Sequence, residues 1–284
     1  MGEIEKVIGM LKNGFINARE TARTPAPRIA LALGGGGTRG FAHIGVIKAL
    51  QSHGIDADVV VGTSVGAAIG ALYAAGFSGF DLQEMTIPMR EGSVREWAWP
   101  KLGLFTGKPL QEFVNKMVEQ RPIEAFPRVF AAIATDLNTG ERTLFRSGNA
   151  GDAVRASCAV PGLFQPFIIG DHTYVDGGLA LPVPVSEARA LGADLVIAVD
   201  VSSRPENNNP DNAINVLLQT FSIMAKAINR YELPLAEVVI SPVTEEIEQS
   251  NLEGRHMAIL EGEKATAEAL PKIMEVLERF TADG

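Results

Sequence analysis

The sequence has few of the residues that stabilise secreted or membrane-spanning proteins. Its 284 residues include one cysteine, Cys158, which cannot form an internal disulfide, so we expect a reducing compartment. No stretch reaches the ~20 apolar residues that a spanning helix needs. Glu3, Glu5 and Lys6 interrupt the first apolar residues, so the N-terminus lacks the pattern of a secretion signal. These absences predict a cytoplasmic protein.

Positive charge is also scarce. Lysine and arginine number 25 against 34 acidic residues, which gives a formal net charge of −9. Nucleic-acid binding needs a basic surface, so no nucleic-acid partner is expected. The overall charge also disfavours attraction to anionic lipid, although a local basic or apolar patch could still contact a membrane.

The chain is expected to form an N-terminal segment and one large domain. Residues 4–20 place apolar side chains at helical spacing, which predicts an amphipathic helix. This helix either packs on the domain or makes a peripheral membrane or partner contact. Residues 24–27 form a short proline-containing linker, so the N-terminal segment covers 1–27. Residues 28–284 have a size typical of a single α/β domain.

Strand and helix patterns alternate through the first part of this domain. Apolar runs at 29–33 and 59–61 each end at glycine and precede a helical pattern, the second of which covers 65–75. This alternation predicts a parallel sheet covered by helices. Further strands are expected at 129–134, 143–145, 167–169, 173–175, 195–199 and 238–240, and a terminal helical segment at 255–280, interrupted near Pro271.

A candidate nucleophile follows the second predicted strand. Gly62-Thr-Ser64-Val-Gly66 fits G-x-S-x-G between a strand of valines and an alanine-rich helix. That setting is the one a nucleophile elbow requires, with the serine on a sharp turn at a helix N-terminus. The alternative is a tight turn whose serine only caps the helix.

A glycine run, Gly34–Gly37, follows the first predicted strand and leads to Arg39 and Gly40. Several backbone N–H groups in such a run can point at one anion, either a phosphate or the oxyanion of acyl transfer, and Arg39 would help to hold either. The spacing from Gly35 to Gly40 also fits a dinucleotide fingerprint, but no acid ends the second strand to bind a ribose. A triphosphate-binding loop would need a Gly-Lys-Ser/Thr sequence here, which is absent.

The serine needs a base, and the four histidines offer no convincing one. His43 and His53 belong to the first predicted helix or its end, and His172 to a hairpin turn. In α/β-hydrolases the histidine follows the acid in the sequence, and only His256 could follow the candidate acid Asp176 in this way. His256 lies in a charged helical stretch. A Ser-His-Asp triad is therefore doubtful.

A carboxylate is the alternative base. Asp176 ends a predicted strand and precedes Gly177 and Gly178, where another backbone can approach closely. It could act as the general base of a serine or only stabilise its own turn. Asp136 and Asp200 also follow strands and are weaker candidates on local grounds.

Four ordered blocks between residues 28 and 202 resemble the patatin-like phospholipase family. They are the glycine loop Gly35–Gly40, the elbow Gly62–Gly66, the segment Ala156–Pro161 with Phe164–Pro166, and Asp176–Gly178. The resemblance implies a three-layer α/β/α sandwich with a central, mostly parallel sheet. It also implies hydrolysis of the carboxylic esters of phospholipids or lysophospholipids, without a metal or other cofactor.

The same resemblance assigns roles to residues. It implies a catalytic dyad of Ser64 and Asp176 without histidine, and it favours Asp176 over the two other acids. Gly35, Gly36 and Gly37, with Arg39, would form the oxyanion hole. The remaining motif glycines are Gly40, Gly62, Gly66, Gly177 and Gly178.

Two expectations concern the rest of the chain. Residues 93–106, with Trp97 and Trp99, form either a flap over acyl chains or part of the core. Cys158 is expected to be a small buried residue near the site, since no activating neighbour is evident.

A non-catalytic adaptor that keeps this fold is the alternative function. The sequence indicates neither the acyl length nor the oligomeric state.

Overall fold

The computed structural model describes residues 27–86, 105–202, 212–244 and 254–282. The predicted helix at 4–20 and residues 93–104 of the predicted flap lie outside these ranges. The division into 1–27 and 28–284 therefore stays a prediction. No helix within the described ranges combines the length and apolar character needed to cross a membrane.

Eight strands form one sheet within the described residues. Five run parallel: β1 (Ile29–Leu33), β2 (Val59–Thr63), β3 (Val129–Asp136), β7 (Leu195–Val199) and β8 (Val238–Ile240). The antiparallel strands are β4 (Arg142–Phe145), paired with β3, and the hairpin of β5 (Phe167–Ile169) and β6 (His172–Asp176). The order is β5-β6-β3-β2-β1-β7-β8. All predicted strands are confirmed.

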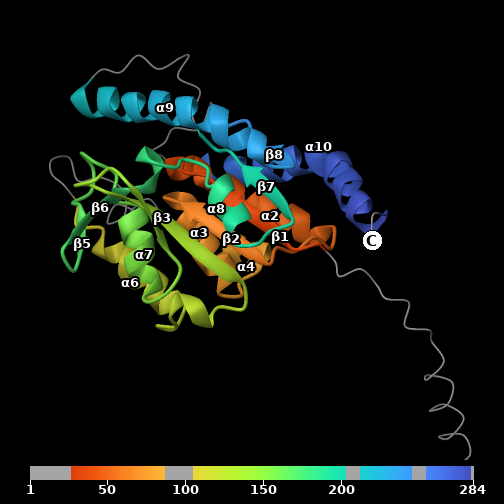
Figure 1. The fold of residues 1–284 in the computed structure, drawn as a ribbon, viewed down its shortest axis with the longest axis horizontal. Coiled ribbons are helices and arrows are strands. Elements are labelled where there is room, and N and C mark those ends of the chain that lie inside the picture. The colour runs from red at the N-terminus through yellow and green to blue at the C-terminus, as the bar shows by residue number, and fades with distance from the viewer. Residues whose placement is uncertain (1–26, 87–104, 203–211, 245–253, 283–284) are drawn as a thin grey trace, which may run out of the picture.

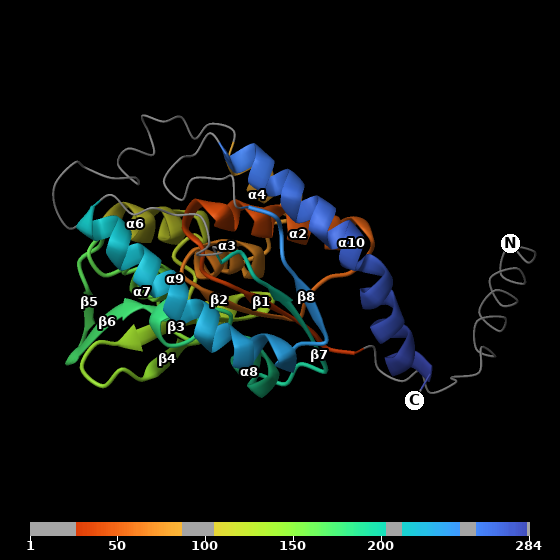
Figure 2. The same cartoon turned by 90° about the horizontal axis from the view of Figure 1, so that it is seen from above.

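The two faces of the sheet pack against different helices. In β1, Leu31 and Leu33 face one side and Ala30 and Ala32 the other, as strand alternation requires. The face that carries Leu31 and Leu33 packs against α2 (Ala42–Ser52), α3 (Val65–Ala74) and α10 (Arg255–Ala282), and the face that carries Ala30 and Ala32 packs against α8 (Val185–Ala190). Figures 1 and 2 show α2 and α10 on one side of the sheet and α8 on the other. The predicted three-layer α/β/α sandwich is confirmed.

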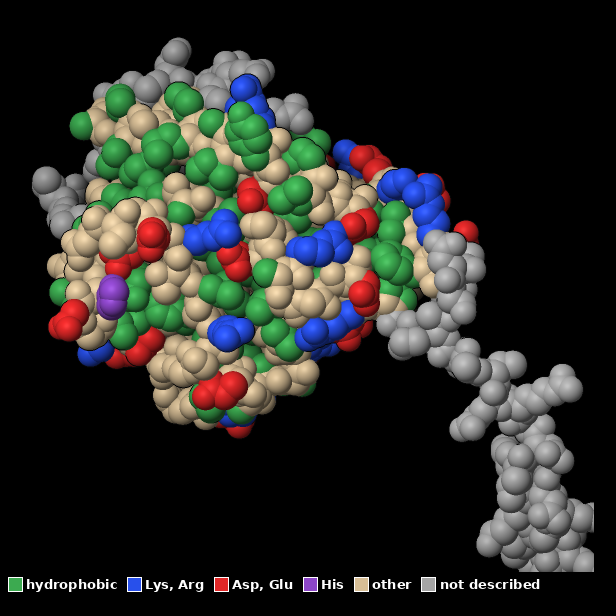
Figure 3. Space-filling view, viewed as in Figure 1, with side chains coloured by type: hydrophobic (Ala, Val, Ile, Leu, Met, Phe, Trp, Pro, Cys, Tyr) green, Lys and Arg blue, Asp and Glu red, His purple; other side chains and the backbone are tan. Residues whose placement is uncertain are grey.

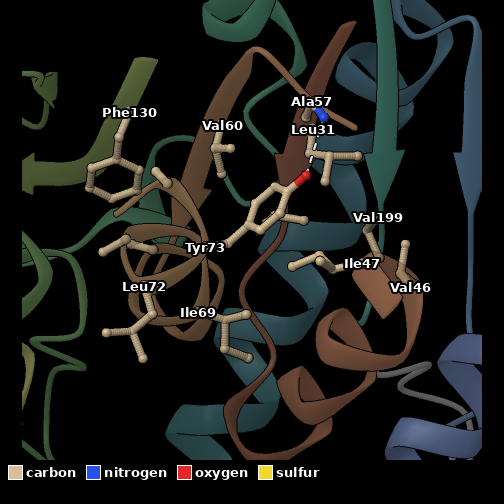
Figure 4. Packing of buried hydrophobic residues seen from close by; sticks show 14 of the residues in the cluster. Leu31, Val46, Ile47, Ala57, Val60, Ile69, Leu72, Tyr73, Phe130 and Val199 are labelled. Carbon is tan, nitrogen blue, oxygen red and sulfur yellow. Dashed lines mark hydrogen bonds between the residues drawn. The ribbon is translucent and has the colours of Figure 1, made fainter. Parts of the chain in front are cut away.

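Tyr73 fixes α3 beneath the sheet (Figure 4). Its buried ring packs among side chains that include Leu31 and Val60, and its hydroxyl accepts a hydrogen bond from Ala57 N at 3.1 Å. The same hydroxyl donates to the carboxylate of Asp56. Because α3 begins directly after the candidate nucleophile, this anchor also holds the turn that carries Ser64.

Helix α10 differs from its predicted form. An interruption near Pro271 was predicted, but the helix is continuous from Arg255 to Ala282. Proline inside a helix costs about 3 kcal/mol. Ile259 and Ile273, on either side of the proline, are buried in the same core, and this packing maintains the helix. Near Ile259 the backbones of α2 and α10 touch, since a Cβ on Gly45 would lie 1.9 Å from Ile259 O.

The strand order places a crevice at the carboxyl ends of β1 and β7. From β1 the chain adds β2 and β3 on one side, and later β7 and β8 on the other. Open parallel sheets bind ligands outside the strand ends at such a switch point. The loops after β1 and β7 meet there, because a Cβ on Gly36 would lie 2.6 Å from Val201 O.

Candidate active site

Ser64 occupies a strained turn between β2 and α3. Its φ of 54° and ψ of −125° place a non-glycine residue in a region that such residues rarely adopt. Its N–H donates to Oγ of the buried Ser157 at 2.8 Å. A strained serine between a strand and a helix N-terminus is the geometry of a nucleophile elbow.

The motif glycines allow close backbone contacts around this turn. A Cβ on Gly66 would lie 2.2 Å from Leu33 O, and one on Gly62 would lie 2.4 Å from Gly66 O. A Cβ on Gly40 would lie 2.4 Å from the side chain of Val65. Any larger residue would push the loops after β1 and β2 apart. A Cβ on Gly177 would lie 2.2 Å from Ile133 O, and one on Gly178 would lie 3.0 Å from Asp176 Oδ1.

The glycine loop after β1 is held by its first residues. Gly34 N donates to Val199 O and Gly35 N to Pro182 O, both at 3.0 Å. Gly37 begins the short 3-10 helix η1 (Gly37–Phe41), and Gly36 precedes it. The first N–H groups of a helix have no partner within that helix. Gly36 and Gly37 therefore offer N–H groups to an anion. Gly35 is also predicted to belong to the oxyanion hole, but its N–H already donates to Pro182 O.

His43 holds the glycine loop through a hydrogen bond, a role that the sequence did not predict. It is fully buried in α2, and its Nε2 lies 2.8 Å from Gly34 O. Burial lowers the pKa of His43 to about 4, while the bond to Gly34 acts in the opposite direction. The ring is therefore neutral near pH 7, and Nε2–H donates to the carbonyl. The only sequence signal was a histidine shortly after the glycine loop.

Asp176 ends β6 and begins the turn η3 (Gly177–Leu179). The residue is 7% exposed, and its Oδ1 accepts from Gly178 N at 2.7 Å. Burial raises the pKa of Asp176 to about 6, and the adjacent Ser64 hydroxyl and Gly178 N–H offset part of the rise. Its Oδ2 is buried and accepts no hydrogen bond from the described residues. The structure thus brings Ser64 and Asp176 together.

Ser64 and Asp176 line a cavity of about 390 Å³ with Gly35, Gly36 and Gly37. Among its described lining residues Asp176 is the one ionisable acid, and no histidine is present. The walls are apolar and come from α2, α3, α4 (Gly79–Thr86), α6 (Lys108–Met117) and α9 (Ala213–Glu232); they include Phe41, Leu72, Met85, Phe113, Leu218 and Phe221. Phe105 and Thr106 are the described residues of the predicted flap, and Phe105 lines this cavity.

The other candidate bases lie elsewhere. Asp136 Oδ1 accepts from Asn138 N and Thr139 N, and its Oδ2 lies 2.7 Å from Nδ1 of His172. Asp200 Oδ1 accepts from Ser202 N. These contacts stabilise turns. His256 is exposed on α10 and does not line the cavity. Within the described part of the chain, no group of three His, Cys, Asp or Glu side chains is placed to hold a metal.

The sequence also makes predictions for Cys158 and Arg39. Cys158 is buried and lines the cavity as expected, and burial raises the pKa of its thiol, so it stays protonated. Arg39 was grouped with the oxyanion hole, but it lines a second cavity, with Asp200 and Lys226. The 3-10 turn rotates successive residues by about 120°, which directs residue 39 away from the side of Gly37.

Comparison with known proteins gives relatives in several organisms. An uncharacterized NTE family protein of Mycobacterium bovis is 33% identical over 205 residues, covering 71% of this chain and 57% of the relative. Human patatin-like phospholipase domain-containing protein 6 is 34% identical over 196 residues, 63% of this chain and 14% of that protein. Lysophospholipase nte1 of Emericella nidulans is 33% identical over 233 residues, covering 78% of this chain and 14% of that protein. This chain thus spans little more than half of the mycobacterial relative and a small part of the others.

Solved structures share the fold at low identity. VipD of Legionella pneumophila superposes with a TM-score of 0.61 at 15% identity, covering 90% of this chain and 67% of VipD. ExoU, in its complex with SpcU from Pseudomonas aeruginosa, superposes with a TM-score of 0.50 at 15% identity, covering 88% of this chain and 52% of ExoU. A model of the family described as patatin-like phospholipase matches residues 31–189, a range that contains Ser64, Asp176 and the glycine loop. The chain belongs to the patatin-like phospholipase family.

Proposed function

We propose that this chain is a serine acyl hydrolase that cleaves the carboxylic esters of lipids, with Ser64 as nucleophile and Asp176 as its general base. One observation carries the proposal: a buried carboxylate lies beside an elbow serine in an apolar cavity. The family description names phospholipases, and one relative is named a lysophospholipase. Phospholipids or lysophospholipids are therefore the substrate classes that we propose.

The reaction begins with proton transfer. Asp176 takes the hydroxyl proton as Ser64 Oγ attacks the ester carbonyl, and the N–H groups of Gly36 and Gly37 stabilise the oxyanion, at about 3 kcal/mol per donor. The C–O bond to the alcohol then breaks, the alcohol takes the proton from Asp176, and an acyl-enzyme remains. Asp176 takes a proton from water, which attacks the acyl-enzyme. The bond from the acyl carbon to Ser64 Oγ then breaks, Oγ takes the proton back from Asp176, and the fatty acid is released. A pKa of about 6 leaves Asp176 ionised near pH 7 and still basic enough to take a proton.

The cavity suits an acyl chain. Its volume of about 390 Å³ lies within the range of small-molecule sites, roughly 300–1,000 Å³. Burying each methylene of a chain against apolar walls contributes about 0.8 kcal/mol. Long acyl chains are therefore expected to be hydrolysed with lower KM than short ones.

Labelling with a fluorophosphonate probe, together with turnover of p-nitrophenyl esters, tests the proposal. Ser64→Ala is expected to abolish both while circular dichroism shows a folded protein. Ser222→Ala is the matched control, because Ser222 lines the same cavity on α9 and should keep both activities. Wild-type turnover by the Ser64 variant would refute the nucleophile. A wild type inert in both assays would favour the non-catalytic adaptor.

We also propose a peripheral contact with lipid through α9. Val216, Ile223 and Met224 are 50%, 54% and 43% exposed, and no charged residue occurs from Ala213 to Ala225. Figure 3 shows hydrophobic side chains gathered over this helix. The same part of α9 lines the cavity through Leu218 and Phe221, so an acyl chain leaving a membrane would find the cavity beside it.

Sedimentation with neutral phosphatidylcholine vesicles tests this contact. Ile223→Ser with Met224→Ser should weaken vesicle binding by about tenfold, since two exposed apolar side chains lose their burial in lipid. Met274→Ser is the control, because Met274 is equally exposed, at 43%, on α10. Equal binding by both variants would contradict a contact through α9.

A further inference from the structure

A second cavity, of about 570 Å³, lies beside the first, between α9 and the loops that follow β7 and β8. Its described lining contains three basic residues, Arg39, Lys226 and Arg230, against one acid, Asp200. Since the chain as a whole carries a net charge of −9, this local excess of positive charge distinguishes the cavity from the rest of the sequence. Such a lining attracts an anionic group.

Asn229 adds a buried polar side chain to this lining. It is 3% exposed, and neither its Nδ2 nor its Oδ1 has a hydrogen-bond partner among the described residues. Buried polar groups in proteins are nearly always paired, because an unpaired one keeps its full desolvation penalty. An amide can donate to an anionic oxygen and accept from a hydroxyl group. A ligand that carries oxygens of both kinds would pair this amide.

One face of α9 joins the two cavities. Leu218, Phe221, Ser222 and Ala225 line the apolar cavity, and Lys226, Asn229, Arg230 and Leu233, which follows α9, line the second. Their spacing of three or four residues keeps them on one helix face. Leu218 and Arg230 are about 18 Å apart along the helix at 1.5 Å per residue. Ser202 borders both cavities, so a single amphiphile can extend from one to the other.

We propose that the second cavity binds the phosphate group of a ligand, with Arg39, Lys226 and Arg230 as its cationic contacts and Asn229 as its amide contact. This inference rests on the proposed function. It assigns the acyl chain to the cavity of Ser64 and the glycerophosphate portion of a lysophospholipid to the cavity of Asn229. A free phosphate ion is the other source of the same chemistry.

Two esters with the same acyl chain, 1-acylglycerol 3-phosphate and 1-acylglycerol, test the inference. Wild type should favour the phosphate ester in kcat/KM. Lys226→Gln with Arg230→Gln, and separately Asn229→Asp, should reduce that preference by about tenfold through a higher KM for the phosphate ester, because charge-assisted hydrogen bonds are lost. The same variants should affect turnover of 1-acylglycerol much less, because that ester carries no phosphate group. Lys264→Gln with Lys272→Gln removes the same charge from α10 as the control.

Calorimetry on Ser64→Ala with inorganic phosphate and with glycerol 3-phosphate separates the sources. Suppose that both ligands bind, that Asn229→Asp abolishes this binding, and that the variants keep the ester preference of wild type. The cavity would then be assigned to a free phosphate. Unchanged ester preference together with no binding of either ligand would overturn the inference. If wild type hydrolyses neither ester, calorimetry alone decides for or against the phosphate site, and the fluorophosphonate and p-nitrophenyl ester assays decide separately whether the proposed function fails.

Discussion

Asp176 and Asp136 lie on neighbouring antiparallel strands, Asp176 opposite Ala134 and Asp136 opposite Tyr174. Asp136 accepts hydrogen bonds from Asn138 N and Thr139 N and pairs with His172, and these contacts, chiefly the one with His172, lower its pKa. Asp176 is buried with few partners, and its pKa rises to about 6. Both carboxylates are buried, at 5% exposure for Asp136 and 7% for Asp176. The comparison shows that residue type, position at a strand end and exposure do not separate their pKa values, whereas their hydrogen-bond partners do.

The largest expected effect concerns ester turnover by the two asparagine variants. Asp176→Asn should lower kcat by about 10³-fold or more, because Ser64 loses the group that takes its proton. Asp136→Asn should keep kcat within about threefold, since Asp136 contacts turn residues and not the cavity. Steady-state kinetics on p-nitrophenyl butyrate measure both. A comparable loss in the two variants would mean that Asp136 also belongs to the site.

The same variants should change stability in opposite directions. The raised pKa of Asp176 means that the folded state binds its proton more tightly than the unfolded state does, so stability falls as pH rises from about 3.8 to about 6. Asp176→Asn removes this penalty and should raise the free energy of unfolding above that range by about 2–3 kcal/mol. The lowered pKa of Asp136 has the opposite sign: its stabilisation is present at neutral pH and is lost as the medium becomes acidic.

Urea denaturation of both variants at about pH 4 and about pH 7.5 measures this contrast. Asp136→Asn should be less stable than wild type at the higher pH. Asp176→Asn should gain most there and little at the lower pH. A loss of stability in Asp176→Asn at neutral pH would contradict the account of its burial.

The smallest expected effect is that of His172→Ala. The pair of His172 and Asp136 has the geometry of half a catalytic triad, with Nδ1 and Oδ2 2.7 Å apart. Because neither residue lines the cavity of Ser64, turnover should stay within about twofold of wild type. His256→Ala should behave in the same way. A larger loss in the first variant would restore histidine to the mechanism.

The sequence predicted the parts of the fold that depend on neighbouring residues. Strands such as Leu195–Val199 are apolar runs bounded by turns, and Ser64 stands in a local pattern between strand and helix. Pro271 shows the limit of this approach. Its local effect on the helix is known, but the packing of Ile259 and Ile273 comes from the tertiary fold and outweighs it.

The site could be predicted only in outline for the same reason. The bond from Ser64 N to Ser157 Oγ joins residues 93 positions apart, and no local pattern indicates it. The support of Gly34 by His43 and the direction of Arg39 depend on how η1 turns after the glycine loop. The wall that α9 contributes lies more than 140 residues beyond Ser64 in the sequence.

The rate of fluorophosphonate labelling of Ser64 as a function of pH tests the central claim most directly. If Asp176 is the base, the rate should rise with pH through a midpoint near 6, because only the ionised carboxylate can take the serine proton. The midpoint should persist in Asp136→Asn and disappear in Asp176→Asn, together with most of the rate. An unchanged midpoint and rate in Asp176→Asn would show that another group activates Ser64 and would contradict the dyad.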